Sequence, residues 1–511
     1  MNTVLILLWS LGQLGFNPGE DRSIYAHNID GPAYICYKAT GGDWDTLAFV
    51  PGPHVGHEFA LPVGASETDS IKYIFPDPIA FAKRRQEKED LPYPTDNDPL
   101  RLSQQLRKPA MEFGWDFAFR NVQTGARPPS FEKEKVWMEH IDVEPAKLWQ
   151  PRIAGGLPRQ DLPVGAARQV ELVTDDINYP FYLNINGHRV FMLGVNAVVP
   201  HDLDKQEALR KRLIEMWKSG GNTVRFWGGA YYPSDRILNT CDSLGIMVWQ
   251  DFSYTGTSYP GDSTFRHWAK QEALYQIKRL TKHPSVVILC GNNEIDVAWN
   301  NWGWQETYHM SFSDSLTLAA NNQWLFGKML PELVKEHGKA AYLNSSPTSN
   351  WGTSEDFKSG CNHDWRVWHG EQPTAVLSEV VAPFVTEWGI PSLPSKTVRR
   401  GWDFKPETYM LSYKGLNLLL RYLHQEEQYS YAGNIAELAE VSRRWQSKVI
   451  SKTLMAQEAA QPYCSGSLIW QLNDVDPVIS WSLIDAADVP KPAWESAKKA
   501  WQRFIFVQRE E

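Results

Sequence analysis

The stretch Val286-Val-Ile-Leu-Cys-Gly-Asn-Asn-Glu294 decides the predicted fold, because an apolar run leads directly into a polar tip that carries one acid. A run this short and this apolar is typical of a strand buried on both faces, as in a parallel sheet covered by helices. Barrel enzymes place their catalytic groups at the carboxyl ends of such strands. The pattern therefore predicts that Glu294 is a site residue; the alternative is a solvated loop acid.

A second stretch, Pro383-Phe-Val-Thr-Glu-Trp-Gly389, repeats this pattern of a short apolar strand that ends in an acid. Glu387 lies far along the chain from Glu294, so only the tertiary fold can bring the two carboxyl groups together. Two carboxyl groups about 5 Å apart suit retaining glycoside hydrolysis, in which one is the nucleophile and the other the acid/base. Alone, Glu387 could equally be a strand-end acid paired with an arginine.

The region around these two stretches alternates strand and helix patterns, as the units of an α/β (β/α)8 TIM barrel should. Amphipathic helices are expected over 205–218, which Gly220-Gly221 ends, and over 267–282, which His283-Pro284 ends. The sixth strand is expected just before 363–368. The other seven are expected at 190–199, 224–228, 247–252, 286–294, 341–344, 384–387 and 466–472. This count places Glu294 after the fourth strand and Glu387 after the seventh.

The motifs along the barrel region resemble those of glycoside hydrolase family 2, and within that family the β-mannosidases. The resemblance rests on segments of specific order and spacing: Asn222-Thr-Val-Arg-Phe-Trp-Gly-Gly229, Cys241-Asp-Ser-Leu-Gly-Ile-Met-Val-Trp-Gln-Asp-Phe252, His283-Pro-Ser, Gly291-Asn-Asn-Glu294, Thr386-Glu-Trp-Gly-Ile-Pro-Ser392 and Trp470-Gln-Leu-Asn-Asp474. It covers roughly residues 181–492. The two-amide form of the Glu294 motif is the feature that favours mannosidase over galactosidase or glucuronidase.

The resemblance implies roles for the polar residues at the strand ends. Glu387 would be the nucleophile and Glu294 the acid/base of a retaining mechanism. Arg225, at the end of the second strand, would hold Glu387 ionised, although a structural ion pair elsewhere in the barrel is the alternative. Asn293 would bind the sugar 2-hydroxyl, a contact that strengthens in the transition state.

Aromatic residues are expected to form the wall of the pocket. The chain has 23 tryptophans, and aromatic faces commonly pack against the apolar faces of sugar rings. Trp227, Trp388 and Trp470 lie at strand ends, where each could form the pocket wall or belong to the core. Trp302 lies in the loop after Glu294, where the resemblance implies an aromatic near the glycosidic oxygen.

One departure from the family pattern concerns the segment after the sixth strand. The family usually has His-Tyr-Trp there, with the tyrosine hydroxyl near the nucleophile, whereas this chain has His363-Asp364-Trp365. An aspartate beside Glu387 would add a like charge and disfavour the ionised nucleophile. Slow or absent turnover is therefore one expectation.

The region before the barrel is expected to be a shortened all-β part. Residues 1–124 are predicted to be a partial jelly-roll sugar-binding domain, 125–180 a reduced β-sandwich or linker, 181–492 the catalytic barrel and 493–511 a C-terminal helix or tail. In the family, a Trp-Asp-Trp loop of the jelly roll reaches the terminal sugar. Here Trp115-Asp116-Phe117 keeps the acid, which could alternatively cap a turn.

Composition excludes few functions and is ordinary for a soluble globular protein. A net charge of −9, with no basic cluster, disfavours a nucleic-acid partner, and the apolar run at the amino terminus is too short to span a membrane. The five cysteines show no metal-type spacing, and Cys361 and Cys464 could pair. No motif suggests a metal or cofactor. The resemblance implies a lysosomal or secreted setting, and the oligomeric state stays open.

The leading prediction is a β-mannosidase that releases terminal non-reducing β-D-mannose from β-mannoside oligosaccharides. Two alternatives remain open. The same chemistry could act on another sugar, such as a β-galactoside or β-glucuronide, or the barrel could be a catalytically silent relative that binds glycans. A hydrolysis assay distinguishes the two enzyme hypotheses from the catalytically silent relative.

Overall fold

The computed structural model describes residues 169–307, 310–349, 357–400 and 415–507, together with the backbones of six strands before residue 75. The chain divides into two compact units. One comprises Met1–His140, Gly256–Glu272 and Trp304–Gln323. The other comprises Ile141–Thr255, Ala273–Gly303 and Trp324–Glu511, and it contains all eight strands of the barrel.

Eight parallel strands form the barrel, in the order β14-β13-β12-β11-β10-β17-β16-β15. Almost every residue of these strands is buried, because helices cover the sheet's outer face and side chains fill its interior. The Thr348 amide, in the segment that follows β14, donates to the Cys361 carbonyl of β15 at 3.0 Å, so this segment lies beside the strand at the other end of the order. The strands are β10 (Met192–Ala197), β11 (Thr223–Phe226), β12 (Met247–Asp251), β13 (Val286–Cys290), β14 (Ala341–Leu343), β15 (Cys361–Asp364), β16 (Phe384–Trp388) and β17 (Gly466–Ile469).

All eight strands lie where the alternating pattern predicts them, so the barrel part of the predicted fold is confirmed. The sixth strand extends slightly further than expected, since His363 and Asp364 belong to β15 and do not follow it. This extension matters for the site, because it fixes which of the two side chains enters the barrel.

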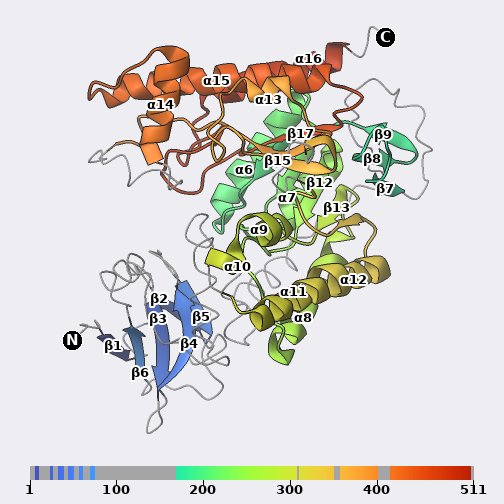
Figure 1. Cartoon of the computed structure of the whole chain (residues 1–511), viewed down its shortest axis with the longest axis vertical. Helices are drawn as coiled ribbons and strands as arrows, with labels where there is room; N and C mark the ends of the chain where they lie inside the picture. The colour runs from blue at the N-terminus through green and yellow to red at the C-terminus, as the bar shows by residue number, and fades with distance from the viewer. Residues whose placement is uncertain are drawn as a thin grey trace. The chain divides into compact units, whose positions relative to one another are not determined.

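Helices follow most of the strands along the chain (Figure 1). Two of them begin at capping residues that the sequence shows. Asp202 caps the first barrel helix by accepting from the amides of Asp204 and Lys205, and Asn434 caps the longest helix in the same way. The helices are α6 (Leu203–Lys218), α7 (Asp235–Leu244), α8 (Ser263–Leu280), α9 (Ile295–Asn301), α10 (Trp304–Thr307), α11 (Phe312–Trp324), the π-helix η2 (Leu325–Met329), α12 (Leu330–His337), α13 (Val376–Glu379), α14 (Gly415–Glu427), α15 (Ile435–Ala459) and α16 (Pro492–Val507).

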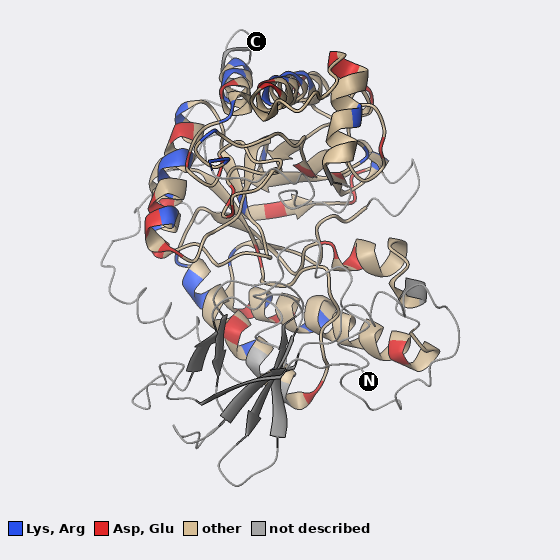
Figure 2. Ribbon diagram, turned by 90° about the vertical axis from the view of Figure 1, so that its left-hand side faces the viewer, with Lys and Arg blue, Asp and Glu red and all other residues tan. Residues whose placement is uncertain are grey.

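Acidic and basic side chains are interspersed along these helices (Figure 2). On α6, for example, Arg210 pairs with Glu207 at 2.6 Å and Arg212 with Glu215 at 3.0 Å, both three residues apart. Such pairs contribute a few tenths of a kcal/mol each, roughly 0.2–0.5. Across the described helices, none combines the length and hydrophobicity that crossing a lipid bilayer requires.

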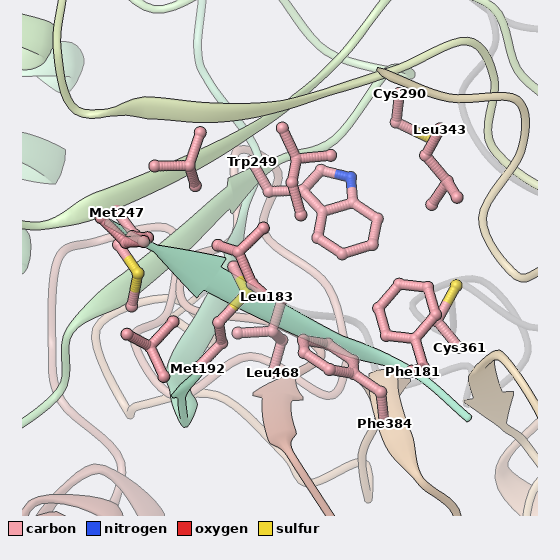
Figure 3. Close-up of a cluster of buried hydrophobic side chains, with 14 residues drawn as sticks. Phe181, Leu183, Met192, Met247, Trp249, Cys290, Leu343, Cys361, Phe384 and Leu468 are labelled. Atoms are coloured by element: carbon pink, nitrogen blue, oxygen red, sulfur yellow. The ribbon is translucent and has the colours of Figure 1, made fainter. Parts of the chain in front are cut away.

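A small antiparallel sheet of β7 (Val170–Val173), β8 (Tyr182–Ile185) and β9 (His188–Val190) packs against the barrel. The turn between β8 and β9 is Asn186-Gly187, with φ of 52° and 81°, which is the left-handed geometry of a two-residue hairpin. Side chains of this sheet enter one cluster with residues that begin barrel strands, including Met192, Met247 and Phe384 (Figure 3). The sheet therefore closes the amino-terminal end of the barrel, opposite the predicted site.

Gly194 in β10 permits the close approach of β11, because a Cβ at this position would lie 1.7 Å from the Thr223 carbonyl oxygen. Since both partners are strand backbone, we expect Gly194→Ala to destabilise the barrel by about 3 kcal/mol or more. Gly433→Ala is the control: its φ is +87°, but a Cβ there meets nothing within 4 Å, so a loss of about 1 kcal/mol is expected. Urea unfolding followed by tryptophan fluorescence compares the two, and equal losses would contradict the argument from packing.

The amino-terminal region forms strands, as predicted. The strands β1 (Ile6–Ser10), β6 (Ser70–Ile74), β3 (Ala33–Lys38) and β4 (Trp44–Val50) make one antiparallel sheet in that order, and β2 (Ser23–Ala26) pairs with β5 (His57–Ala60). The jelly-roll assignment and the proposed domain boundaries stay predictions. Trp115 and Asp116 lie outside the described residues.

The suggested pairing of Cys361 with Cys464 is wrong. Both thiols are free and buried. Cys361 begins β15 and Cys464 precedes β17, and β16 lies between these two strands in the sheet. A disulfide needs Cα atoms no more than about 7 Å apart, whereas alternate strands are separated by roughly twice the 4.8 Å interstrand spacing.

Candidate active site

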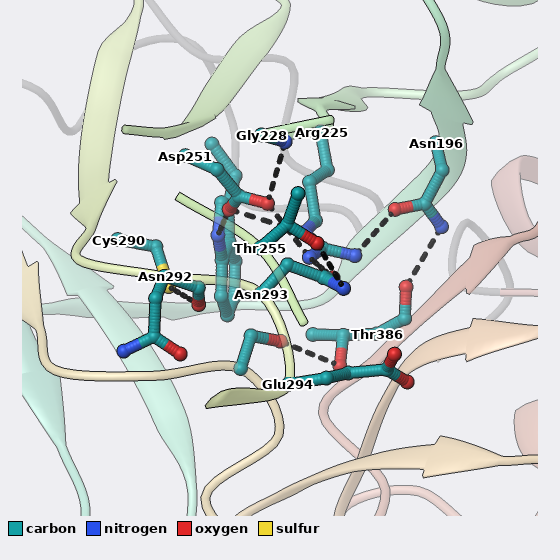
Figure 4. A network of polar contacts seen from close by, with 12 residues as sticks. Asn196, Arg225, Gly228, Asp251, Thr255, Cys290, Asn292, Asn293, Glu294 and Thr386 are labelled. Carbon is teal, nitrogen blue, oxygen red and sulfur yellow. Dashed lines mark hydrogen bonds and ion pairs between the residues drawn. The ribbon is translucent and has the colours of Figure 1, made fainter. Parts of the chain in front are cut away.

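Polar side chains from six barrel strands meet at the carboxyl-terminal end of the sheet. Parallel strands all end on the same side, so residues at their ends converge although they are far apart in sequence. All of these residues are buried, and Figure 4 shows several of them pointing toward one another. They are Asn196 (β10), Arg225 (β11), Asp251 (β12), Asn293 and Glu294 (after β13), His363 (β15) and Glu387 (β16).

Arg225 is the centre of this network, and its five N–H groups all have acceptors. Two donate to Asp251, from Nε at 3.2 Å and from Nη2 at 2.7 Å. Nη1 donates to Asn196 Oδ1 at 2.9 Å and to Glu387 Oε1 at 2.6 Å, and Nη2 also reaches Asn293 Oδ1 at 2.5 Å. The planar guanidinium therefore sets the positions of four other side chains at once.

Burial alone would lower the pKa of Arg225, but the carboxylates of Asp251 and Glu387 more than offset this and raise it. The guanidinium therefore stays charged and holds one oxygen of Glu387. Arg225 contacts Glu387, as predicted. It also forms a second buried ion pair, with Asp251, which was the alternative partner type considered.

Glu294 lies in a tight turn between β13 and α9, where it is the N-cap residue with a left-handed φ of 62°. Non-glycine residues adopt this geometry at a cost of about 1–3 kcal/mol, and only where the surroundings impose it. Here Asn292 imposes it, since its Oδ1 accepts from the amide of Ile295 at 3.0 Å and from the hydroxyl of Ser345 at 2.7 Å. The Glu294 amide donates to the Ser346 carbonyl at 2.8 Å.

The two amides before Glu294 thus have different tasks. Asn292 holds the turn, whereas Asn293 faces the barrel interior, where its Oδ1 accepts from Arg225 and its Nδ2 donates to Thr255 Oγ1 at 3.2 Å (Figure 4). The Asn293 amide group also hydrogen-bonds to the Glu294 carboxyl group, which lowers the pKa of that acid and partly opposes the effect of its burial.

His363 lies between the two glutamates. Its Nδ1 is 2.7 Å from Glu294 Oε1 and 3.3 Å from Glu387 Oε2. On the other side of the ring, Nε2 is 3.0 Å from the hydroxyl of Ser346. The imidazole is almost fully buried and so links the two acids inside the barrel.

Asp364 does not lie beside Glu387, and the expected like charge is absent from this position. Successive side chains of a strand point to opposite faces, so that His363 points into the barrel and Asp364 points out of it. Asp364 forms a two-pronged ion pair with Arg366, at 2.8 and 2.6 Å. The next residue, Trp365, donates its indole N–H to Glu387 Oε2 at 3.3 Å, so Glu387 gains a hydrogen-bond donor in place of a repelling charge.

The ionisation of the glutamates reflects their burial. Burial raises the pKa of Glu294 to about 7, and the nearby Arg225 opposes this shift only in part. Burial also raises the pKa of Glu387, and the charge of Glu294 adds to it, while His363 and Arg225 oppose it. Burial lowers the pKa of His363 to about 3, so this imidazole is neutral at physiological pH. Arg225 contacts Glu387 directly, which favours Glu387 as the ionised member of the pair.

Glu294, His363 and Glu387 each offer one ligand atom, and these three atoms all lie within 4.8 Å of one another. The geometry would admit a small cation. Two features oppose it: the Arg225 guanidinium already holds Glu387, and the raised pKa of Glu294 keeps one oxygen protonated below about pH 7. The expectation of a metal-free site remains a prediction.

The predicted tryptophans fall into three groups. Trp227 and Trp470 pack edge to face at the strand ends, with ring centroids 5.2 Å apart, and can form a pocket wall. Trp388 belongs to the core instead, because it follows the inward-facing Glu387 and therefore points toward the helices, where its indole N–H donates to Ser467 at 3.0 Å. Trp302 ends α9 and is 38% exposed, and its predicted role near the glycosidic oxygen stays a prediction.

Sequence reasoning assigned no role to Asn196, Asp251, His363 or Trp365. Asn196 and Asp251 are polar residues at the ends of otherwise apolar strands, which is the same signal that pointed to Glu294. His363 and Trp365 flank Asp364, the residue at which the sequence departs from the family pattern. Only the strand alternation around Asp364 reveals which neighbours enter the site.

A parallel eight-stranded barrel with a buried glutamate pair at the carboxyl ends of its strands has the architecture of the glycoside hydrolase barrels. Among named proteins, the chain is 28% identical over 420 residues to β-mannosidase B of Aspergillus terreus, covering 73% of this chain and 48% of the relative. With β-mannosidase B of Aspergillus flavus it is 28% identical over 430 residues, covering 75% of this chain and 50% of that protein.

A crystal structure of β-D-mannosidase from Dictyoglomus thermophilum shares the fold, with a TM-score of 0.59 and 21% identity over 98% of this chain and 70% of that chain. No family model matches the chain. The chain spans about half the length of the curated relatives it matches. The resemblance to the β-mannosidases of glycoside hydrolase family 2 is thereby confirmed.

Proposed function

We propose that this protein is a retaining exo-glycosidase that releases terminal non-reducing β-D-mannose from β-mannosides. The main support is the buried pair of Glu294 and Glu387: one carboxylate oxygen of each lies within 4.8 Å of the other, beside Arg225. Retaining enzymes have carboxyl groups about 5–5.5 Å apart, while inverting enzymes need about 6.5–9.5 Å to admit a water. The separation therefore favours double displacement.

In the first step, Glu387 attacks the anomeric carbon while Glu294 gives its proton to the leaving oxygen. Arg225 and the indole N–H of Trp365 keep Glu387 ionised and aimed, since one holds Oε1 and the other Oε2. The raised pKa of Glu294 keeps its proton available near neutral pH. The products are a covalent mannosyl-enzyme and the released aglycone.

In the second step, Glu294 is a carboxylate and takes a proton from the incoming water, which attacks the anomeric carbon. Glu387 leaves as a carboxylate, and the sugar departs with its original configuration. Arg225 again stabilises the charge that returns to Glu387.

Mannose is the proposed sugar because the named relatives are β-mannosidases and because the site carries two amides before the acid/base. Asn293 would bind the 2-hydroxyl, which is axial in mannose. Trp227 and Trp470 would contact the ring, and Trp302 would lie near the glycosidic oxygen. A lysosomal or secreted setting is part of the same proposal.

The test is hydrolysis of aryl β-mannoside, β-galactoside and β-glucuronide by the purified chain, with the anomer of the first product determined by NMR. Release of β-mannose from the mannoside alone supports the proposal. Preference for either of the other substrates would replace mannose with that sugar, and initial release of the α-anomer would exclude the retaining mechanism. Glycan binding without any turnover would favour the alternative of a catalytically silent, glycan-binding relative. Asp364 does not support this alternative, because it pairs with Arg366.

The pH profile provides a prediction with a defined sign. Because Glu294 must be protonated to act as an acid and its pKa is about 7, we expect kcat/KM for 4-nitrophenyl β-mannoside to fall as the pH rises through about 7. On the acid side, kcat/KM falls as Glu387 takes up a proton. Because Glu294 and Glu387 interact, the two apparent pKa values of the profile belong to the pair and not to either residue alone.

The control substrate is 2,4-dinitrophenyl β-mannoside, whose leaving group departs without a proton. Its kcat/KM should lose the basic limb and keep the acid limb. A basic limb of equal depth with both substrates would mean that Glu294 is not the acid.

A further inference from the structure

We infer that Gly229 is a positioning residue for the sugar subsite: the Trp227 indole fills the space that a side chain at Gly229 would occupy. The inference rests on the proposed function, in which Trp227 contacts the sugar ring, and it deepens that function. A Cβ at Gly229 would lie 2.1 Å from Cη2 of Trp227 and 2.4 Å from both Cζ2 and Cζ3. The three nearest atoms therefore all belong to the outer ring of this one indole.

The backbone at Gly229 does not itself require glycine. Its φ is not positive, in contrast to Gly187 and Gly433 with φ of 81° and 87°, so no left-handed geometry opposes an alanine there. The neighbouring Gly228 differs, since a Cβ at that position would lie 2.5 Å from the Phe252 carbonyl oxygen, which is backbone. Of these two adjacent glycines, Gly229 is the one that makes room for a side chain of the pocket wall.

Packing, and not hydrogen bonding, fixes the place of the Trp227 indole. Its Nε1 is buried and has no hydrogen-bond partner among the described residues. The ring packs edge to face on Trp470, with the two ring centroids 5.2 Å apart. A ring held only by its contacts takes the position that these contacts leave open, so a methyl group added at Gly229 must displace it.

The backbone of Trp227 is less free to move than its ring. Its amide donates to the Ala197 carbonyl at 3.3 Å, and its carbonyl accepts from the Ala230 amide at 3.1 Å. The first of these bonds continues the ladder between β10 and β11, so Trp227 keeps the inward direction that Arg225 has two residues earlier. A clash at Gly229 therefore moves the ring into or out of the subsite and leaves the end of the strand in place.

Gly229→Ala is expected to raise KM for 4-nitrophenyl β-mannoside about tenfold while kcat falls by less than about threefold, because the wall contacts substrate and transition state alike. Gly433→Ala is the control, since it adds the same methyl group where a Cβ meets nothing within 4 Å, and it should leave both constants unchanged. A fall in kcat with KM unchanged would mean that the substitution disturbs the catalytic groups, and it would overturn the inference.

A double-mutant cycle with Trp227→Leu separates an effect on the indole from an effect on the backbone. Leucine lacks all three atoms that a Cβ at Gly229 would meet. Adding Gly229→Ala to Trp227→Leu should therefore change KM by less than about twofold. The same rise in KM in both backgrounds would show that Gly229 acts without the indole, which would contradict its role as a positioning residue.

The free energy of unfolding gives a readout that does not depend on turnover. In urea titrations followed by circular dichroism, Gly229→Ala should lower it in the wild type and leave it nearly unchanged in Trp227→Leu, because only the indole meets the added methyl group. Equal losses in both backgrounds would overturn the inference. If this difference is present but no aryl β-mannoside, β-galactoside or β-glucuronide is hydrolysed, the proposed function alone is refuted.

Discussion

Glu387→Ala is expected to lower kcat for aryl β-mannosides by on the order of 10⁵-fold, because without the nucleophile no covalent intermediate forms. The variant should remain folded, since Arg225 keeps its two bonds to Asp251 and the removed carboxylate was itself costly to bury. Steady-state assays on 4-nitrophenyl β-mannoside measure the loss. Glu336→Ala, which removes a glutamate whose side chain is 70% exposed, is the matched control and should be unchanged.

Azide distinguishes the roles of the two glutamates. In Glu387→Ala, azide can take the nucleophile's place and attack the anomeric carbon directly, which yields the α-mannosyl azide. In Glu294→Ala, Glu387 still forms the intermediate and azide then displaces it, which yields the β-mannosyl azide. The same anomer from both variants would show that the assignment of nucleophile and acid/base is wrong.

Arg225→Leu should have the largest effect on stability. It leaves Asp251 and Glu387 as buried carboxylates without their cation, and breaking a buried ion pair in this way costs about 3–5 kcal/mol. Asn196 and Asn293 lose their donors as well. The free energy of unfolding is obtained from urea titrations followed by tryptophan fluorescence at pH 7.

The control for this variant is Arg421→Leu, because Arg421 also pairs with a glutamate, Glu371, but both side chains are more than two-fifths exposed. Removing an exposed pair should lower the free energy of unfolding far less than removing the buried one. Lowering the pH should shrink the loss in Arg225→Leu, since the stranded carboxylates can then take up protons and become neutral. A loss no larger than that of the control would mean that the guanidinium does not hold the site together.

Sequence patterns predicted the barrel well because its strands are short, apolar runs with a polar residue at the end. The stretch ending at Glu294 and the stretch ending at Glu387 are both of this kind, and a parallel sheet requires both to end on the same side. The contact of Arg225 with Glu387 follows the same logic, since its strand also ends there.

What a linear pattern could not decide was the face to which each strand-end side chain points. Trp388 could have belonged to the pocket or to the core, and Asp364 was expected beside Glu387. Each lies one residue after an inward-facing side chain and therefore points outward. A shift of one residue reverses the face, and the irregular register between Asn362 and His363 cannot be read from composition.

The sequence by itself determined the fold class, the positions of the eight strands and the two acids, because burial on both faces and the polar strand ends are local signals. Only the tertiary structure decided that all five N–H groups of Arg225 are satisfied, that His363 and not Asp364 stands between the glutamates, and that Cys361 and Cys464 are apart. These are distances between residues from different strands, and the closure of the sheet sets them.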